Sequence, residues 1–497
     1  MSPPFGRLLI ANRGEIAVRI IRACAELGIE SIAVYSDADV QALHVQMADR
    51  AEPIGPAPAV RSYLSAEAIL DAARRSGADA IHPGYGFLSE NAAFAEAVEM
   101  AGIVFVGPPP ATLAALGDKL AARRSVSAAG VPIVPGLLVP LGDPSSVDLT
   151  EVGFPAMLKA AAGGGGRGMR RVDRPEDVPA ALAAAAREAQ AAFGNGTVYA
   201  ERLISPARHV EVQLLGDRHG NLVCLGERDC SVQRRHQKLV EESPSPAVGA
   251  ALRAAMFEDA RRVAGTVDFS NAATVEFLVD DAGRHYFLEM NTRLQVEHGV
   301  TELVTGLDLV ALQIRIAAGE RLPDAALRVE PHGHAIEVRL YAEDPYDDFR
   351  PVGGRVGAWR LPDGPGVRVD AGVTAGSPLP AEYDPLLAKL LVHAADRPAA
   401  LARLHRALDE TLIGGVQTDL GFHRWLVDEP GFVAGEYHTS LITDRWGAGP
   451  ELEASAYAAA AAAALAARGS ARPTEAQPAA PHGSAWARLA RREAIDR

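Results

Sequence analysis

The chain has 497 residues, of which 48% are hydrophobic and 23% charged, and its formal net charge is −14. This length exceeds what one hydrophobic core supports and predicts about two to four structural units. The acidic balance disfavours a nucleic-acid partner, which would need a concentrated basic face. No apolar run reaches the roughly 18 residues of a membrane span, and the start, MSPPFGRLLIANRGE, lacks the features of a signal peptide. We therefore expect a cytoplasmic protein without a membrane partner.

The basic residues are strongly biased toward arginine. Of the 49 lysines and arginines, the four lysines are Lys119, Lys159, Lys238 and Lys389. A lysine offers a compact ammonium group where the planar guanidinium of arginine does not fit, so these positions are candidate sites; chance placement is the alternative. The three cysteines are Cys24, Cys224 and Cys230. Their spacing matches no metal site, and we expect reduced thiols with a structural role.

The first third of the chain alternates between strands and helices. The expected elements are a strand at Arg7–Ala11, a helix at Glu15–Leu27 ended by Gly28, a strand at Ser31–Tyr35, a helix at Ala66–Ser76 and a strand at Ala78–Ile81. This alternation predicts an open parallel sheet with right-handed crossovers. The first turn, Asn12-Arg13-Gly14-Glu15, is not G-x-G-x-x-G, so a dinucleotide site is unsupported there.

From about Gly117 the pattern changes to alternating strands of the antiparallel type. Examples are Ala156–Ala160, Val198–Leu203, His209–Leu215 and Ala273–Val279. A third unit is expected from about His332 to Trp446. Beyond it, the pure alanine tract Ala458–Ala464 could form a helix, and the stretch Arg472–Ser484, rich in proline and alanine, is expected to be a linker.

The glycine run Gly163–Gly166 follows the strand that ends near Lys159. It lacks the G-x-x-x-x-G-K-[ST] pattern of a P-loop and is not expected to open a helix. Consecutive glycines between strands give a hairpin whose backbone N–H groups can close over phosphates, and Lys159 can reach a phosphate as a point charge. A flexible surface hairpin is the alternative.

A predicted hairpin brings two carboxylates together. The strands at 274–279 and 285–289 flank the turn 281–284, which contains Gly283. If the turn is centred between Ala282 and Gly283, Glu276 lies directly opposite Glu289, and Asn291 shares the face of Glu289. Opposed carboxylates repel each other, so the pairing favours a divalent cation with hard oxygen ligands. A solvated face with the register shifted by one residue is the alternative.

The continuation from Asn291 to Glu297 alternates polar and apolar residues. On one strand face, Asn291, Arg293, Gln295 and Glu297 could line an anion pocket that ends in a general base. A half-exposed edge strand explains the pattern equally well. Two further stretches carry polar groups: 209–213 alternates like a strand facing a polar cleft, and 233–238 concentrates cationic and amide groups. A stable half-buried strand and a solvated loop, respectively, are the alternatives.

Several motifs in these regions are similar to those of a known family. They read IANRGEIAVRIIRA, HPGYGFLSEN, GDK, KAAAGGGGRGM, RHVEVQ, ERDCSVQRRHQK, VEF, EMNTRLQVEH and EVRLYAEDP, in chain order over about residues 5–446. Together they resemble the biotin carboxylases of the ATP-grasp superfamily. The resemblance implies an α/β and α+β protein with four parts: a Rossmann-like N-terminal domain at 1–116, an ATP-grasp domain at 117–331 with a lid at about 133–204, a mixed C-terminal biotin carboxylase domain at 332–447, and an Ala/Pro-rich tail or linker at 448–497.

The resemblance also implies an activity, namely an ATP-dependent ligase that makes carboxybiotin from ATP, bicarbonate and carrier-bound biotin by way of carboxyphosphate. The residues implied to bind ATP are Lys119, Lys159, Gly165, Gly166, Met169, Glu201, Arg202, Ile204, His209, Gln233, His236 and Leu278. Two ions of Mg²⁺ or Mn²⁺ are implied at Glu276, Glu289 and Asn291. Many relatives carry lysine at the position of Arg202.

The bicarbonate and biotin sites are implied in the same way. Lys238, Arg293, Gln295 and Val296 would bind bicarbonate, and Glu297 would deprotonate it. Lys238, Arg293, Glu297 and Arg339 form the implied catalytic set. Arg339 would stabilise the enolate-like oxygen of biotin, with Tyr85 beside the biotin ring. Gly299 stands where many relatives have proline, which we expect to loosen the chain after Glu297. The turn at 350–354 also differs from the usual family sequence.

The implied partners are a biotin carboxyl carrier protein or domain, a carboxyltransferase subunit and a second copy of the chain. No lysine is flanked by methionines as in a biotin-attachment motif, so the carrier is expected on another chain or in a C-terminal continuation, and the region near Trp486 is compatible with one. The leading interpretation is the first half-reaction of an acyl-CoA carboxylase. The alternatives are a pyruvate carboxylase subunit, another ATP-grasp ligase such as a carbamoyl-phosphate-type synthetase, and a non-catalytic ATP-binding regulator.

Overall fold

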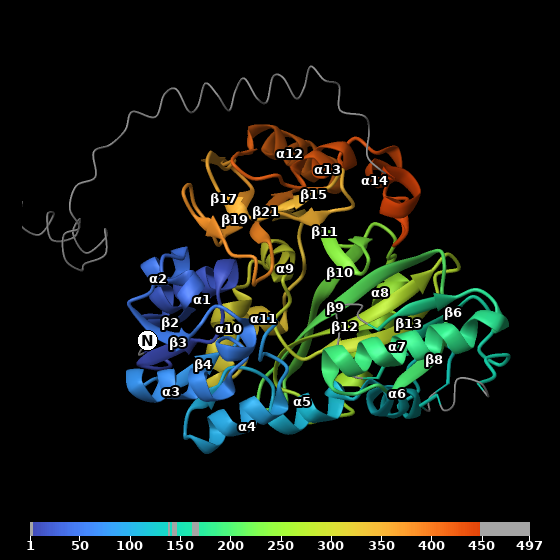
Figure 1. The fold of residues 1–497 in the computed structure, drawn as a ribbon, viewed down its shortest axis with the longest axis horizontal. Coiled ribbons are helices and arrows are strands. Elements are labelled where there is room, and N and C mark those ends of the chain that lie inside the picture. Colours follow the sequence, from blue (N-terminus) through green and yellow to red (C-terminus); the bar gives the residue numbers. More distant parts are fainter. Residues whose placement is uncertain (1–2, 138–139, 142–146, 162–167, 448–497) are drawn as a thin grey trace, which may run out of the picture.

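The computed structural model describes residues 3–137, 140–141, 147–161 and 168–447. Its three larger sheets contain five, eight and three strands. Figure 1 shows the N-terminal sheet and its helices on one side of the molecule, the three-stranded sheet on the other, and the C-terminal helices above the large sheet. Three predictions lie outside the described residues: the glycine run at 163–166, the alanine tract at 458–464 and the linker at 472–484 with the region around Trp486.

The N-terminal sheet is parallel, with the strand order β3-β2-β1-β4-β5. Its strands are β1 (Arg7–Ile10), β2 (Glu30–Ser36), β3 (Arg50–Gly55), β4 (Ala80–His82) and β5 (Val104–Phe105), and its main helices are α1 (Gly14–Leu27), α3 (Ala66–Ser76) and α4 (Ala92–Met100). Alternate residues of β1 enter two different cores, one with α1 and the other with α3 and α4. The predicted open parallel sheet is confirmed, and the structure adds that helices cover both of its faces.

Helix ends in this unit follow local chemistry. The chain leaves α1 at Gly28, which has the left-handed φ of 70° that glycine tolerates best. The side chain of Ser65 caps α3 by accepting from the Ala68 N–H. The strand predicted at 78–81 begins at Ala80 instead, because the Ala78 N–H is used to close the end of α3. The other predicted elements of this region lie within about two residues of their expected bounds.

The central sheet is antiparallel, with the order β13-β12-β9-β10-β11-β14-β21-β19. The strands are β9 (Ala207–Gly216), β10 (Leu222–Arg234), β11 (Gln237–Ser243), β12 (Asn271–Asp280), β13 (His285–Asn291), β14 (His334–Tyr341), β19 (Val367–Ala371) and β21 (Leu386–Ala394). The pairing of β11 with β14 carries this sheet across the expected boundary at 331/332. Helix α8 (Ala250–Ala264) packs in the same core as alternate residues of β9 and β12, which leaves the opposite sheet face for polar side chains.

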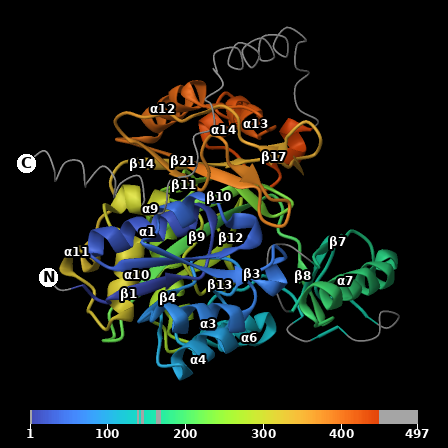
Figure 2. The same cartoon turned by 60° about the vertical axis from the view of Figure 1, so that its left-hand side comes forward.

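A smaller unit projects beside the central sheet (Figure 2). Strands β6 (Ala156–Ala160), β7 (Arg170–Val172) and β8 (Val198–Arg202) form its antiparallel sheet in the order β7-β6-β8. Helix α7 (Val178–Phe193) packs on this sheet through Val178 and Leu182, which share a core with Leu158. This unit has its own sheet and its own small hydrophobic core, so it forms a separate body beside the central sheet.

The C-terminal unit is joined to the central sheet by a buried ion cluster. Its helices α12 (Arg397–Glu410), α13 (Leu420–Leu426) and α14 (Pro430–Ala434) share a core with β11, β14 and β21. Glu242 of β11 is 2.5 Å from His334 Nε2 and 2.7 Å from Arg397 Nε, and it also accepts from the Tyr437 hydroxyl. Burial alone would raise the pKa of Glu242, but His334 and Arg397 lower it to about 2.

We expect Glu242→Gln to destabilise the protein by about 3 kcal/mol at neutral pH, because it removes the charge partner of the half-buried Arg397 from a buried cluster. A carboxyl group whose folded-state pKa is depressed contributes stability above its unfolded pKa of roughly 4.3 and loses it as the pH falls toward 2. Urea unfolding of wild type and variant should therefore converge in that range. Glu258→Gln, at an exposed pair with Arg262, is the control and should change little. If the difference in unfolding free energy between wild type and Glu242→Gln did not change with pH, this account would be contradicted.

Within the described ranges, no helix is both long enough and apolar enough to cross a bilayer. The three cysteines are free thiols. Cys24 and Cys230 are buried and Cys224 is half-buried, and burial raises the pKa of each thiol above its ordinary value. The structure therefore agrees with the expectation of reduced cysteines.

Candidate active site

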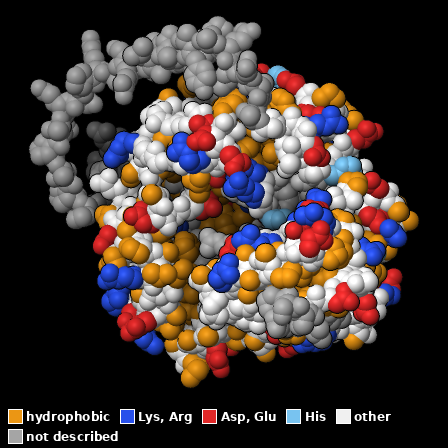
Figure 3. Space-filling model, turned by 45° about the vertical axis from the view of Figure 1, so that its right-hand side comes forward, with side chains coloured by type: hydrophobic (Ala, Val, Ile, Leu, Met, Phe, Trp, Pro, Cys, Tyr) orange, Lys and Arg blue, Asp and Glu red, His pale blue; other side chains and the backbone are white. Residues whose placement is uncertain are grey.

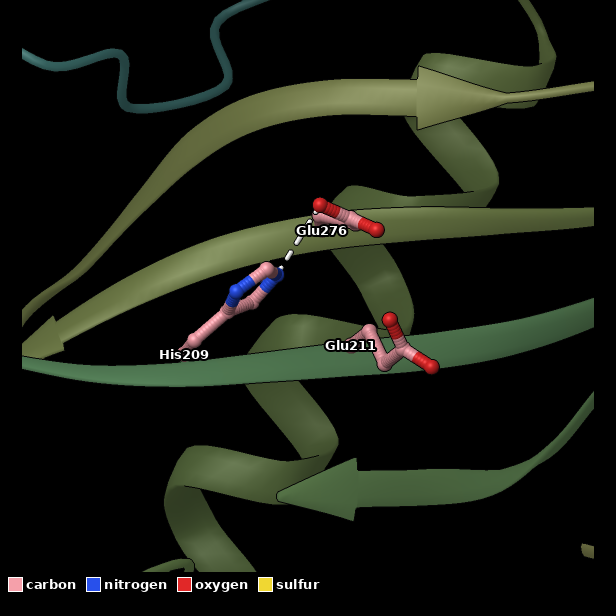
Figure 4. A group of neighbouring side chains, drawn as sticks. All are labelled: His209, Glu211 and Glu276. Atoms are coloured by element: carbon pink, nitrogen blue, oxygen red, sulfur yellow. Dashed lines mark ion pairs between the residues drawn. The ribbon is translucent and has the colours of Figure 1, made fainter. Parts of the chain in front are cut away.

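The candidate site lies on the face of the central sheet that α8 leaves open. Along β9, His209 and Glu211 lie on this face, whereas Val210 and Val212 enter the core. Glu276 of β12 is paired in register with Glu211, and its Oε2 lies 2.9 Å from His209 Nε2 (Figure 4). The period-two interpretation of 209–213 as a strand with one polar face is confirmed. Figure 3 shows a hollow in one side of the molecule with basic, acidic and histidine side chains around it.

The predicted hairpin is formed by β12 and β13, and Glu276 lies directly opposite Glu289. The predicted reason is incomplete, however. Near the turn, Val279 pairs with His285. The turn is therefore centred on Ala282, whereas the prediction centred it between Ala282 and Gly283. A β-bulge next to Glu276 adds one residue on β13 and shifts the register so that the two carboxylates meet.

Lys238 of β11 lies at the centre of three carboxylates. Its Nζ donates to Glu211 at 2.7 Å, to Glu297 at 2.7 Å and to Glu276 at 3.0 Å. Burial would lower the pKa of Lys238, but the surrounding acidic groups raise it well above its ordinary value. The group is therefore a permanent cation at neutral pH. A compact ammonium that donates in three directions matches the expectation for lysine in this arginine-rich chain.

Glu297 is fully buried and lies between two cations. Its Oε1 accepts from Lys238, and its Oε2 accepts from Arg339 Nη2 at 3.0 Å; Arg339 also pairs with Glu241. Burial would raise the pKa of Glu297, but Lys238 and Arg339 lower it well below its usual range. Cys230 Sγ lies 3.8 Å from Oε1, next to the site rather than in a remote core. The carboxylate is ionised and can accept a proton from a bound acid.

The strand expected from Asn291 to Glu297 is not formed. Strand β13 ends at Asn291, and Glu297 is the residue that precedes helix α9 (His298–Thr305). After Asn291 the chain leaves β12, although β12 continues to Asn271, and the Thr292 N–H donates to Glu90 Oε1 at 3.1 Å instead of to that strand. The polar side chains nevertheless converge: Arg293 donates to Asn291 Oδ1 at 3.1 Å, to Gln295 Oε1 at 2.9 Å and to Glu90 at 3.0 Å. The loop therefore brings the side chains of Asn291, Arg293 and Gln295 together, as the sequence pattern predicted, but without a strand.

Two more lysines lie on the expected nucleotide side of the site. Lys119, at the start of α6 (Lys119–Ala128), donates to Glu289 at 2.7 Å. Lys159 of β6 is 2.6 Å from Glu201 of β8, which also pairs with Arg123 at 2.7 Å. Burial would raise the pKa of Glu289, but Lys119 lowers it, so that carboxylate is also ionised. Lys119 of α6, Lys159 of β6 and Lys238 of β11 thus contribute three ammonium groups from separate elements to this region.

The remaining residues expected to bind ATP are less uniformly placed. Gln233 Nε2 lies 3.4 Å from His209 Nδ1. His236 is exposed in the β10–β11 turn and has a φ of 69°. Arg202 is exposed and donates to the Val152 carbonyl at 3.0 Å, within the small unit. The half-buried members of the set are Met169, Ile204 and Leu278. Gly165 and Gly166 lie outside the described residues.

The two residues expected near biotin come from different units. Arg339 lies on β14, and Tyr85 lies on the loop after β4, where its hydroxyl donates to Glu15. Val296, which is expected to bind bicarbonate, is half-buried, and its carbonyl accepts from Lys389 Nζ at 2.6 Å. The residues expected to bind biotin and bicarbonate therefore come from a loop of the N-terminal unit, from the central sheet and from the segment after β13.

Sequence reasoning missed two charged residues of this network. Arg228 of β10 is fully buried and donates to Glu211 at 2.6 Å, directly across the strand pair. Glu241 of β11 pairs with Arg339. Arg228 belongs to the quoted motif ERDCSVQRRHQK, which was the available signal, but its role follows only from the pairing of β10 with β9. Nothing in the sequence around Glu241 identified it.

The predicted metal ligands form a donor set that suits a hard divalent cation. Glu276 and Glu289 are adjacent carboxylates on paired strands, and Asn291 donates to Glu276 through its amide while its Oδ1 faces Arg293. In the structure these carboxylates are balanced by Lys119 and Lys238, and His209 Nε2 lies 2.9 Å from Glu276 Oε2. Ligand atoms of His209, Glu211 and Glu276 also lie within 4.8 Å of one another. Oxygen-rich chemistry of this kind fits Mg²⁺ or Mn²⁺ shared with phosphates.

Gly299 does not loosen the chain after Glu297, contrary to the expectation. It lies inside helix α9 and is buried. A Cβ added there would overlap Leu391 Cδ2 and lie 3.2 Å from Glu337 Oε2. The glycine therefore makes room for close packing between α9 and β21.

Comparisons with known proteins agree with this geometry. Three families match the chain in order: "Biotin carboxylase, N-terminal domain" at residues 4–113, "Carbamoyl-phosphate synthase L chain, ATP binding domain" at 118–325, and "Biotin carboxylase C-terminal domain" at 337–444. A biotin carboxylase from Nostoc sp. is 50% identical over 442 residues, covering 88% of this chain and 99% of the relative. The propionyl-CoA carboxylase alpha chain of Ruegeria pomeroyi is 45% identical over 469 residues, covering 90% of this chain and 69% of the relative.

A solved structure agrees as well. The biotin carboxylase domain of the Hydrogenobacter thermophilus 2-oxoglutarate carboxylase, described as a dimer with MgADP, ADP and bicarbonate, is 42% identical. It superposes with a TM-score of 0.88 and covers 90% of this chain and 99% of that chain. With the ATP-grasp sheet, the charged cluster around Lys238 and these matches taken together, the chain belongs to the biotin carboxylase family of ATP-dependent ligases.

Proposed function

We propose that the chain carboxylates carrier-bound biotin with ATP and bicarbonate through carboxyphosphate, releasing ADP and phosphate. The single observation that carries this proposal is Glu297, a buried and ionised carboxylate that lies between Lys238 and Arg339. The two cations keep Glu297 ionised and weaken it as a base, so their favourable contribution is to attract a bound anion and to stabilise the charge that develops on it. The biotin carboxylase of Nostoc sp., which is 50% identical to this chain over 442 residues, supports the same activity.

ATP is proposed to bind between the small unit and the central sheet. Lys119 and Lys159 would meet its phosphates, with Gln233, His236 and His209 along the nucleotide. Glu201, Arg202, Ile204 and Leu278 would border the adenine side, and Gly165, Gly166 and Met169 would belong to the closing loop. Glu276, Glu289 and Asn291 would hold the two divalent ions, whose chemistry is to neutralise phosphate oxygens. Lys119 and Lys238 already counter those carboxylates in the structure, which supports a site built to balance phosphate and metal charge.

Bicarbonate is proposed to bind against Lys238, Arg293, Gln295 and Val296. Glu297 takes its proton, and the resulting oxygen attacks the γ-phosphorus of ATP as the bond to ADP breaks. Carboxyphosphate then divides into CO₂ and phosphate, and the phosphate takes the N1 proton of biotin before N1 attacks CO₂. These steps depend on positioning and charge balance more than on covalent catalysis. The convergence of Arg293 on Asn291 and Gln295 supports this arrangement.

Biotin is proposed to lie between Tyr85 and Arg339. As the N1 proton leaves, negative charge builds on the ureido oxygen, and a guanidinium can donate to it. Arg339 is already ordered by Glu241 and Glu297, so its position requires little rearrangement. The two residues come from separate units, which leaves room for a carrier to deliver biotin between them.

The family membership implies a biotin carrier partner and dimerisation. We further propose a carboxyltransferase subunit as the acceptor of carboxybiotin, within an acyl-CoA carboxylase, and the cytoplasm as the location. The propionyl-CoA carboxylase relative supports the acyl-CoA assignment. For the organisation of the chain we propose working units at 1–116, 117–331 and 332–447, followed by a linker at 448–497.

The direct test is ATP hydrolysis by the purified chain with bicarbonate, with and without free biotin. We expect hydrolysis to require bicarbonate and to rise severalfold when biotin is added, measured as ADP release. Hydrolysis without any response to biotin would favour another ATP-grasp ligase. Nucleotide binding without hydrolysis would favour a regulator.

A further inference from the structure

Lys389 is the lysine to which the proposed function gives no role. It lies on β21, is fully buried, and its Nζ donates to the Val296 carbonyl at 2.6 Å. The same Nζ lies 3.2 Å from Glu15 Oε1 and 4.0 Å from Asp370 Oδ2. One ammonium therefore contacts the loop that precedes Glu297, helix α1 of the N-terminal unit and strand β19.

The strand register explains why Lys389 lies beside the site. Arg339 of β14 and Lys389 of β21 are directly paired, so their side chains project from the same face of the sheet. Arg339 donates to the side chain of Glu297, and Lys389 donates to the carbonyl of the residue before it. Two neighbouring cations thus hold the Val296–Glu297 peptide and its carboxylate at the same time.

Lys389 remains charged in this position. Burial would lower its pKa, but Glu15, Glu337 and Asp370 raise it above its ordinary value. The carboxyl group of Glu337 is buried without a hydrogen-bond partner, and burial raises its pKa well above the usual range. Lys389 therefore has Glu15 and Asp370 as charge partners and donates a hydrogen bond to the Val296 carbonyl.

Glu15 extends the connection to the proposed biotin side. Its carboxylate accepts from the hydroxyl of Tyr85 and also faces Lys389. Lys389 thus contacts Val296, which precedes the proposed base, and is linked through Glu15 to Tyr85, which is proposed to lie beside biotin. An arginine could not replace it without moving these closely spaced partners, because the planar guanidinium needs more room.

We infer that Lys389 is a positioning residue, which sets the Val296–Glu297 peptide relative to Arg339 and Tyr85 so that the base meets bicarbonate in a productive geometry. This inference rests on the proposed function. It goes beyond that function because Lys389 touches no reacting group and acts only through the peptide and through Glu15. Small displacements of a catalytic group cost as much as about 10²-fold in rate.

The test is Lys389→Met, which keeps the length of the side chain and removes the charge and the donors. We expect kcat/KM for bicarbonate to fall about 10²-fold, with a higher KM for bicarbonate and a KM for ATP within about twofold of wild type. A merely structural role would reduce the active fraction and leave both KM values unchanged, and that result would overturn the inference. The control is Arg397→Met, which breaks a buried ion pair with Glu242 away from the site and should leave the KM for bicarbonate unchanged.

The single variant leaves Glu15 buried beside a lost cation, which can prevent folding. The double variant Lys389→Met with Glu15→Gln removes both charges and still lacks the donor to Val296, so it should fold and show the raised KM for bicarbonate. A normal KM for bicarbonate in the double variant would overturn the inference. If the wild type itself shows no bicarbonate-dependent, biotin-stimulated hydrolysis, the proposed function fails and the inference fails with it, whereas failure of the variants alone leaves the function standing.

Discussion

Replacing Glu297 by glutamine is expected to lower bicarbonate-dependent ATP turnover by about 10³-fold while leaving ATP affinity within a few fold of wild type. Glutamine has nearly the same shape, but in this geometry its single oxygen can accept from only one of Lys238 and Arg339, and it cannot take a proton. Because Glu297 is not among the residues proposed to contact ATP, the loss should appear in turnover rather than in ATP affinity. Steady-state ADP release and titration with a non-hydrolysable ATP analogue measure the two quantities.

Glu302, in the helix that begins directly after Glu297, provides a matched control. Glu302 of α9 is also a buried glutamate held by arginines, 2.9 Å from Arg19 and 2.7 Å from Arg368. Glu302→Gln makes the same chemical change outside the site, so it should reduce stability and keep turnover within a few fold. If Glu297→Gln retained a tenth or more of wild-type turnover, Glu297 would not be the base. Equal losses in both variants would indicate a structural effect.

Replacing Lys238 by methionine is expected to abolish turnover, with a loss of about 10³-fold or more. Glu211, Glu276 and Glu297 would lose the cation that all three contact, at 2.7 to 3.0 Å. Bicarbonate would then face uncompensated negative charge, and the carboxylates would take up protons more readily because burial raises their pKa. The proposed base would also lose its orientation. Turnover is measured as ADP release over a range of bicarbonate concentrations.

The same variant should change how stability depends on pH. Carboxyl groups whose folded-state pKa is raised bind more protons when folded, so the stability of the variant falls as the pH rises through those pKa values. The difference in melting temperature between wild type and Lys238→Met should therefore widen from pH 5 to pH 8. Arg253→Met removes the cation next to the single buried carboxylate of Glu227 and should retain turnover, with a smaller pH effect. A melting difference that is constant with pH would contradict the assignment of Lys238 as the common counter-charge.

Local sequence patterns were sufficient for much of the fold. Alternation of strands and helices predicted the parallel sheet, and Gly28 marks the end of α1 because a left-handed residue stops the helix there. The polar alternation at 209–213 predicted a strand with one polar face. These features depend on residues close together in the chain, and short-range geometry determines them. The order of the motifs is equally informative, since it identifies the family without any knowledge of tertiary contacts.

Long-range pairing decided the site itself. Glu276 meets Glu289 only because a bulge on β13 corrects the register, and the segment at 292–297 is irregular rather than extended. Composition marked Lys389 as unusual, but only the pairing of β21 with β14 places it beside Arg339.

The sequence by itself determined the family, the order of the units and the residue types of the site. The tertiary structure alone decided which charges neutralise one another, because Lys238, Glu297 and Arg339 come from separate segments, and their contacts form only once the strands are in register. Electrostatic partners depend on distance in space, which spacing along the chain does not determine.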